Sequence, residues 1–290
     1  MKTIAAFALV LSATSLIAQT KATPVEVTVS QVNDRRTNGS FSRLTIALEL
    51  PKIRSSEVEA SRVLLAAATD DSGQNLLNPE ASEPQLEPNM RGRFGGAETM
   101  PATIVNLELV NPDRKATTVK EVRGEIELYM PGKDSNSVAE ISKFLSTSGK
   151  PLSHKALKAN GVEITLLTEK QIEAERKRIA DAKRKEYKDA GWEDGESLEE
   201  MVKSLLSSLL GVQESDLLAR IKDPNKRIQE ISYVDASGEV KRISTHDEEG
   251  LTYFSTWGDK PQADWKLRIS MKTSKNMIRH SFALKDVALP

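Results

Sequence analysis

Two short aspartate-containing segments are the first places where this sequence could do chemistry. The segment DDSGQN offers Asp70, Asp71 and Asn75 as oxygen ligands for calcium, and the later segment DASGE offers Asp235 and Glu239. A calcium loop of the EF-hand type also needs oxygen ligands at alternate positions and a distal bidentate glutamate, which neither segment supplies. We therefore predict two tight turns and no metal site. In each turn Ser-Gly provides a positive φ angle and the aspartate caps the turn.

Groups suited to catalysis are few elsewhere in the chain. The absence of cysteine excludes disulfides, thiol catalysis and thiolate metal sites. The three histidines, His154, His246 and His280, have no metal-ligand spacing, and His280 alternates with apolar residues, which predicts a side chain that faces the core. There is no nucleophile elbow, Walker A loop or dinucleotide-binding motif. A hydrolase with two carboxylates far apart in the sequence stays an open alternative, but we predict no enzyme and no cofactor.

Two tryptophans raise the question of sugar binding. Trp257 and Trp265 flank a GDKPQAD turn, and exposed rings there could stack on sugars. Packing of both rings within a hairpin is the favoured interpretation, because tryptophan is mostly buried in folded proteins.

The segment 168–224 is predicted to be a helical insertion. Thr168 with Gln171, and Ser197 with Glu200, have the spacing of capping boxes, and a third short helix is expected over 216–222. The second helix carries a wide apolar stripe: Leu198, Met201, Val202, Leu205, Leu206, Leu209 and Leu210. Docking of this stripe on the chain's own sheets is the favoured interpretation. The alternative is a protein partner or self-association, with Leu198, Met201, Val202, Leu205 and Leu209 as contact residues.

The remainder of the chain alternates apolar and polar residues with a period of two, which is typical of antiparallel sheets with one buried face. The pattern covers 25–129 and resumes at 162–166 and after 228, through the final strand that contains His280. We predict a mainly β protein of two tandem immunoglobulin-like antiparallel sandwiches, 23–132 and 137–290, the second interrupted by the helical insertion. The two aspartate turns suggest a weak internal repeat, and convergent turn chemistry is the alternative.

The first 22 residues are typical of an export signal, with Lys2 before an apolar stretch and small residues at Ala18 and Ala22. This predicts a periplasmic or secreted bacterial protein with no membrane span after cleavage of the signal. The net charge of −1 and an aromatic content of 4% argue against nucleic acid as a partner.

Four segments carry a resemblance to a known group of proteins: LELVNPDRKATTVKEVRGEIELYMP, SGKPLSHKALKANGVEITLL, ISYVDASGEV and SFALKDVALP. In these the chain resembles uncharacterised exported bacterial proteins of planctomycete-like lineages. The resemblance implies tandem immunoglobulin-like domains and implies no activity.

These observations lead to a functional hypothesis. We expect an exported, non-enzymatic binding or structural protein that acts through contacts with protein or envelope partners. The alternative is a carbohydrate-binding module or an accessory domain of a glycan-degrading system, with Trp257 and Trp265 as ligand-binding residues.

Overall fold

The computed structural model describes residues 22–37, 42–80, 82, 84–89, 102–192, 195–209, 216–256 and 260–290. Residues 1–21 of the predicted export signal and Trp257 lie outside these ranges, and the side chains of residues 205–209 and 248 are not described. The chain divides into two compact units, one formed by residues 1–128 and 277–290 and the other by residues 129–276.

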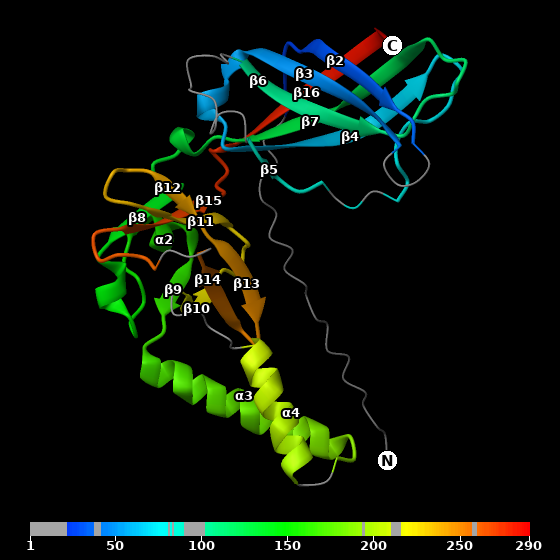
Figure 1. Cartoon of the computed structure of the whole chain (residues 1–290). Helices are drawn as coiled ribbons and strands as arrows, with labels where there is room; N and C mark the ends of the chain where they lie inside the picture. Colours follow the sequence, from blue (N-terminus) through cyan, green and yellow to red (C-terminus); the bar gives the residue numbers. More distant parts are fainter. Residues whose placement is uncertain are drawn as a thin grey trace, which may run out of the picture. The chain divides into compact units, whose positions relative to one another are not determined.

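The first unit contains two sheets (Figure 1). A five-stranded sheet has the order β1 (Thr23–Pro24), β16 (Met277–Ala288), β7 (Thr118–Tyr129), β4 (Ala60–Asp70) and β5 (Glu87–Pro88). A three-stranded sheet has the order β2 (Thr28–Arg35), β3 (Arg43–Arg54) and β6 (Ala102–Leu109). The β2–β3, β3–β6 and β4–β5 pairs are antiparallel, and β1 pairs in parallel with β16. A short 3₁₀ helix, η1 (Ser55–Glu57), links β3 to β4.

The core of the first unit follows from the period-two pattern. The alternate residues of β3, β6 and β7 that the sequence marks as apolar are buried: Leu44, Ile46, Leu48, Leu50, Val105, Leu107, Leu109, Val122, Ile126 and Leu128. Because successive side chains point to opposite faces of a strand, each of these strands contributes one apolar face to the same interior.

Gly124 lies where β7 comes close to the backbone of β4. A Cβ atom added at Gly124 would lie 2.4 Å from the Leu64 carbonyl oxygen and 3.1 Å from the Leu65 Cα atom. Both are backbone atoms, so the strands would have to move apart to admit a methyl group. We expect Gly124→Ala to lower the free energy of unfolding by about 1–3 kcal/mol, measured by urea denaturation, because overpacking shifts the backbone.

Gly132 provides the matched control for this substitution. It lies in the 3₁₀ turn η2 (Pro131–Lys133) of the other unit, and an added Cβ there would meet no atom within 4 Å. Gly132→Ala is expected to change stability little. If both variants lost the same free energy of unfolding, the close approach of β7 and β4 would not be the cause of the loss in Gly124→Ala.

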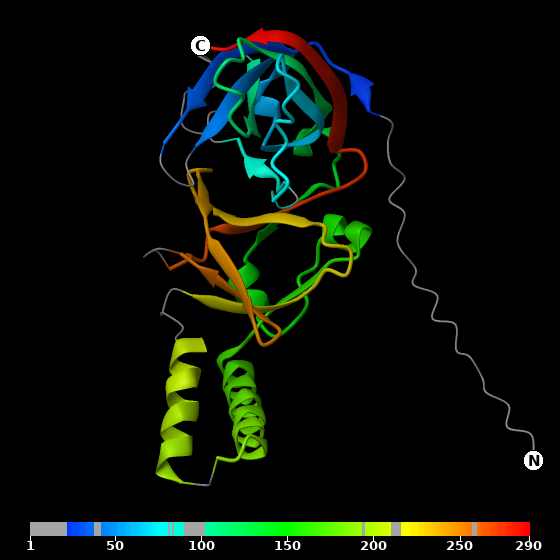
Figure 2. The ribbon, with the colours of Figure 1, turned by 90° about the vertical axis from the view of Figure 1, so that its right-hand side faces the viewer.

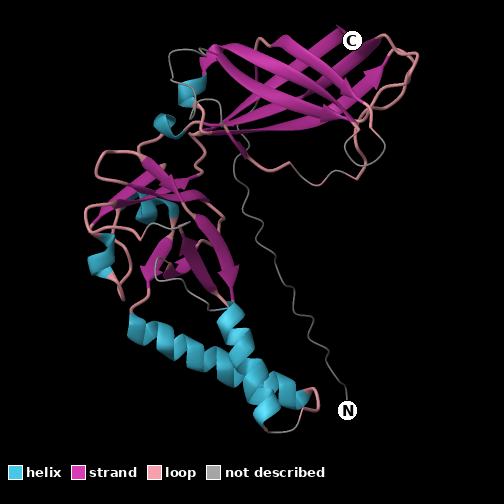
Figure 3. Cartoon of the chain, in the orientation of Figure 1, coloured by secondary structure: helices cyan, strands magenta, loops and turns pink. Residues whose placement is uncertain are grey.

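The second unit also contains two sheets. One has the order β12 (Val240–Arg242), β11 (Ile228–Val234), β15 (Lys266–Met271) and β8 (Val138–Ser142), and the other β13 (Ser244–Glu248), β14 (Leu251–Ser255), β10 (Leu217–Lys222) and β9 (Glu163–Leu166). All their pairs are antiparallel. The helices of this unit are η3 (Phe144–Thr147), α2 (Lys155–Asn160), α3 (Glu169–Asp189) and α4 (Glu196–Leu209), and Figure 3 separates them from the strands by colour.

One hydrophobic cluster joins both sheets of the second unit. Ile141, Tyr233, Leu267 and Ile269 come from one sheet, and Ile164, Leu166, Ala219 and Phe254 come from the other. Ala156 and Leu157 of α2 complete the cluster. The two sheets and the short helix therefore enclose a common core.

The last strand is in a different unit from the one predicted. The sequence placed 137–290 in one C-terminal domain, but Met277–Ala288 forms β16 between β1 and β7 in the sheet of the first unit. The alternating pattern of this segment was interpreted correctly as a strand. A period of two defines a buried face, yet it does not determine which sheet the strand joins.

One segment expected to be helical is a strand. Residues 216–222 were predicted as the third helix of the insertion, and Leu217–Lys222 is β10, which pairs with both β9 and β14. Leucine, alanine, lysine and arginine favour helices locally, but pairing between neighbouring strands overrides that weak preference. The helices of the insertion therefore end at Leu209 among the described residues.

The predicted class is confirmed at the coarse level. The protein is mainly β, with several antiparallel sheets and a pair of long helices between β9 and β10. Capping of α3 is also as predicted, since Thr168 and Gln171 form a complete capping box.

Candidate functional site

The two aspartate turns share one hydrogen-bond pattern. Oδ1 of Asp70 accepts hydrogen bonds from the backbone N–H and hydroxyl of Ser72 and from the Gln74 N–H, at 2.7–3.0 Å. Oδ1 of Asp235 accepts from the corresponding groups of the second turn, at 2.6–2.9 Å. The glycine of each turn has φ of +88°. The turn prediction is confirmed, because each aspartate caps its turn and each glycine takes the left-handed conformation.

Asp70 differs from Asp235 in its surroundings. The Asp70 residue is 1% exposed, and its second oxygen accepts a hydrogen bond of 2.9 Å from the Asp113 backbone N–H. Burial alone would raise the pKa of Asp70. The hydrogen bonds from the Ser72 hydroxyl and from three backbone N–H groups outweigh burial, so the pKa lies below its usual value. Asp70 therefore joins its own turn to the loop that contains Asp113.

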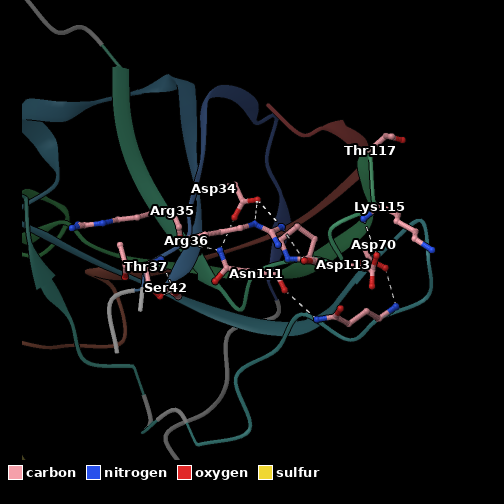
Figure 4. Close-up of polar contacts among 12 residues, drawn as sticks. Asp34, Arg35, Arg36, Thr37, Ser42, Asp70, Asn111, Asp113, Lys115 and Thr117 are labelled. Carbon is pink, nitrogen blue, oxygen red and sulfur yellow. Dashed lines mark hydrogen bonds and ion pairs between the residues drawn. The ribbon is translucent and has the colours of Figure 1, made fainter. Parts of the chain in front are cut away.

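A second set of contacts connects the end of β2 to that same loop (Figure 4). Asp34 accepts hydrogen bonds from the Asn111 side chain at 2.5 Å and from Nε of Arg36 at 2.8 Å. Arg36 also donates to the Pro112 carbonyl at 3.0 Å, and Asn111 donates to the Arg35 carbonyl at 2.9 Å. Three loops at one end of the first unit are thus held together by polar contacts.

The carboxylates of these loops are engaged by donors of the chain. Asp71 accepts from the backbone N–H and hydroxyl of Thr117, which lowers its pKa, and Asp113 accepts from the Lys115 N–H. Within the described ranges no group of three or more His, Cys, Asp or Glu side chains is arranged to hold a metal ion. These hydrogen bonds position the loops relative to one another.

A buried carboxylate on β7 was not identified from the sequence. Glu127 is 1% exposed and lies between two arginines of the same sheet, Arg62 on β4 and Arg279 on β16. Nε of Arg62 donates a hydrogen bond of 2.6 Å to Oε2 of Glu127. Nη2 of Arg279 lies 2.5 Å from Oε1 of Glu127 and forms an ion pair whose geometry is not that of a hydrogen bond. Glu127 alternates with the buried Ile126 and Leu128, as a solvent-facing residue of the strand would, so no pattern in the sequence marked its burial.

A cavity of about 490 Å³ lies beside β4 in the first unit. Its walls are residues 61–65 of β4, residues 105–108 of β6 and part of the segment 77–87. Arg62, which pairs with Glu127, also donates to the Pro84 carbonyl at 3.1 Å. The ion-paired arginine therefore positions the outer wall of the cavity.

The structure places Trp265 in the core of the second unit. Its residue exposure is 7%, and its ring lies 6.0 Å from that of Tyr233, which stacks on Phe144 at 5.5 Å. This favours the packing interpretation for Trp265, while Trp257 lies outside the described residues. Trp192, at the end of α3, is 43% exposed and was not among the sequence candidates.

The α3 helix is anchored on the sheet that contains β10 and β14. Ile179 is buried in a cluster with Leu218, Leu251 and Tyr253 of that sheet. Glu175 pairs with Arg178 and also with Arg220 of β10; the hydrogen bond from Arg178, followed by that from Arg220, lowers its pKa despite some burial. An apolar contact and a charged contact thus fix the first half of α3.

The α4 helix packs on the second half of α3; the two helices cross in the view of Figure 1 and lie next to each other in Figure 2. Leu198 and Val202 are buried against Ala180 and Tyr187 of α3, and Met201 is half-buried. Arg184 donates to both carboxylate oxygens of Glu199, at 2.7 and 2.9 Å. The first half of the predicted stripe is therefore covered by α3 and not by a sheet. The side chains of Leu205 and Leu209 lie outside the described set.

No family model, no curated protein and no solved structure matches the chain. Its function therefore has to be inferred from its own residues and geometry.

The three histidines occupy separate structural positions. His154 caps α2 by accepting from the Ala156 N–H, and His246 stacks on Tyr253 at 4.4 Å. His280 is half-buried beside Thr23, at 3.4 Å, and not in the core as expected. Among the described helices none is long and apolar enough to cross a membrane.

Proposed function

We propose that the protein is an exported, non-enzymatic binding protein, built of two tandem immunoglobulin-like sandwiches, that contacts a protein partner through the α3–α4 hairpin. The two sheets of each unit, with their many antiparallel pairs, and the signal-like first 22 residues support this proposal. The proposal includes that the protein acts in the periplasm or outside the cell.

The observation that carries the proposal is the mismatch between the two helices of the hairpin. The first half of the α4 stripe meets apolar residues of α3, since Leu198 and Val202 are buried with Ala180 and Tyr187. The first half of α3 is rich in charge: Glu173 and Lys177 are exposed, and Arg176 pairs with Glu173 at 2.6 Å. In the sequence the stripe continues through Leu205 and Leu209, whereas the apolar Ile172 and Ile179 of α3 pack on the sheet. An apolar surface on another polypeptide would match the later turns of α4.

The carbohydrate-binding alternative has less support. Trp265 packs within the core of the second unit, with its ring tilted by 50° against that of Tyr233, where it is shielded from a sugar. A glycan array with Trp257→Ala and Trp265→Ala would favour the alternative if sugar binding were found and then lost in those variants.

The double variant Leu205→Asp/Leu209→Asp tests the proposed contact. We expect it to abolish self-association or partner crosslinking, because two charges would replace the apolar centre of the interface. Self-association is measured by sedimentation velocity, and partner contact by a photo-crosslinking residue at position 206 in the producing cell. The β units should keep their unfolding transition.

Ser204→Asp/Ser208→Asp is the matched control, since it adds the same charge at positions between the leucines of the stripe. It is expected to preserve association. If the leucine variant kept its stability, its association state and its crosslinks, the hairpin would not be a binding element.

A further inference from the structure

The outer edge of β4 is interrupted between two paired stretches. At its start, Ala60 and Ser61 pair with β5, and the Glu59 carbonyl accepts from the Asn89 N–H. At its end, the Ala68 carbonyl accepts from the Leu76 N–H. Between these stretches, residues 62–67 have no partner strand on this edge among the described residues. At about 3.3 Å per residue the gap is about 20 Å long.

The direction of the main-chain groups along this edge does not alternate regularly. The carbonyls of Glu59 and Ala68 accept hydrogen bonds at the same edge, although they are an odd number of residues apart. Regular alternation would require an even separation, so the direction of the main-chain groups changes between Glu59, just before β4, and Ala68. Alternation from Glu59 and Ser61 at the start of the strand directs the main chain of Val63 to the same open edge, while the Leu64 carbonyl lies near Gly124 of β7.

The cavity of about 490 Å³ lies along this same gap. The chain leaves the β4 edge after Leu76, forms the far wall as part of the segment 77–87 and returns to the edge at Glu87. β6 forms the second rim, and its outer edge also has no partner strand among the described residues. Arg62 holds the far wall through the Pro84 carbonyl.

The lining of the cavity indicates the class of ligand. Val63, Leu65 and Leu107 are apolar, Ser61 and Asn106 provide hydrogen-bonding groups, and none of the lining residues is aromatic. Sugar sites built on stacking need an aromatic ring, whereas an added strand needs an unpaired main chain and small pockets for alternate side chains. The gap and its cavity offer the second combination.

We propose that this gap in the β4 edge accepts an extended peptide segment of a partner protein, which pairs as an added strand beside Val63. This inference rests on the proposed function as a protein-binding molecule and names a second contact site, separate from the α3–α4 hairpin. Exposed strand edges are known to recruit such segments.

Selection from a phage-displayed library of random heptapeptides against residues 23–290 tests the site. The enriched sequences are expected to alternate apolar and polar residues. A fluorescein-labelled synthetic copy is then titrated by anisotropy against Asn106→Trp, which fills the cavity. We expect affinity to fall about tenfold or more. Asn33→Trp is the matched control, because Asn33 is an exposed asparagine on the opposite edge of the same sheet, and it should bind as the parent does.

Hydrogen exchange gives the second readout, with protection expected at the amides of residues 62–67 when the peptide is bound. Failure to enrich any peptide, equal binding by Asn106→Trp and the parent, or protection confined to other segments would each overturn the inference. Leu205→Asp/Leu209→Asp should bind the peptide normally. If only that variant failed to bind the peptide, the result would contradict a binding site at the cavity and would place the peptide at the α3–α4 hairpin.

Discussion

Replacing Glu127 with alanine is expected to lower the free energy of unfolding by about 3 kcal/mol, the largest single effect we predict. The carboxylate is 1% exposed and pairs with Arg62 and Arg279, so its removal leaves two like charges facing each other in one sheet. Breaking a buried pair typically costs about 3–5 kcal/mol. The lower end applies here because the arginine side chains are 22% and 27% exposed and keep some contact with water. Urea denaturation measures the loss.

Two further variants separate the charge from the packing. Arg62→Met/Glu127→Leu/Arg279→Met replaces the whole set with apolar groups and should recover much of the stability, because no charge is left unpaired. Glu108→Ala removes a carboxylate from a largely exposed pair with Arg43 and should cost less than about 1 kcal/mol. A loss of that small size for Glu127→Ala would show that the two arginines do not depend on Glu127.

Replacing Asp70 with asparagine is expected to lower the free energy of unfolding by about 2–3 kcal/mol. Asparagine keeps an oxygen for the Ser72 and Gln74 donors, but its NH₂ group replaces the oxygen that accepts from the Asp113 N–H. A buried N–H then faces another donor, and an unsatisfied group of this kind costs about 1–3 kcal/mol, more where a charge is lost. Thermal and urea unfolding measure the effect.

The second turn supplies the control for Asp70. Asp235→Asn changes the same position of an equivalent turn, where the second oxygen has a lysine amine 3.6 Å away and no backbone donor among the contacts described. Asparagine is favourable in such turns, so stability should hardly change. Similar losses in the two variants would mean that the turn, and not the bond to Asp113, determines the cost.

The contribution of Asp70 should also depend on pH in a defined direction. Its pKa in the folded protein lies below the unfolded value of about 3.9, so the stabilisation is complete above that value. It is lost as the pH falls through the folded pKa. The stability difference between the parent and Asp70→Asn should therefore narrow on acidification below about pH 4, as followed by urea denaturation.

Local chemistry allowed parts of this protein to be predicted from sequence. The Asp-x-Ser-Gly turns are determined by neighbouring atoms, since a glycine with positive φ and a side-chain oxygen two residues before a backbone N–H need nothing from the rest of the chain. The capping box of α3 is equally local. Strand alternation depends only on successive side chains pointing to opposite faces, which is why the mainly β class was predicted correctly.

Features that depend on partners far away in the chain became visible only in the tertiary structure. Met277–Ala288 shows the same alternation in either unit, and its place between β1 and β7 is decided by the strands available to pair with it. Leu217–Lys222 is a strand because β9 and β14 lie on both sides of it, against its local helical preference. The partners of Glu127, 65 and 152 residues away, and the gap in the β4 edge likewise follow from long-range pairing. The sequence by itself thus determined turns, caps and buried faces, because short-range sterics and hydrogen bonds set them, and the fold decided which faces, charges and edges meet.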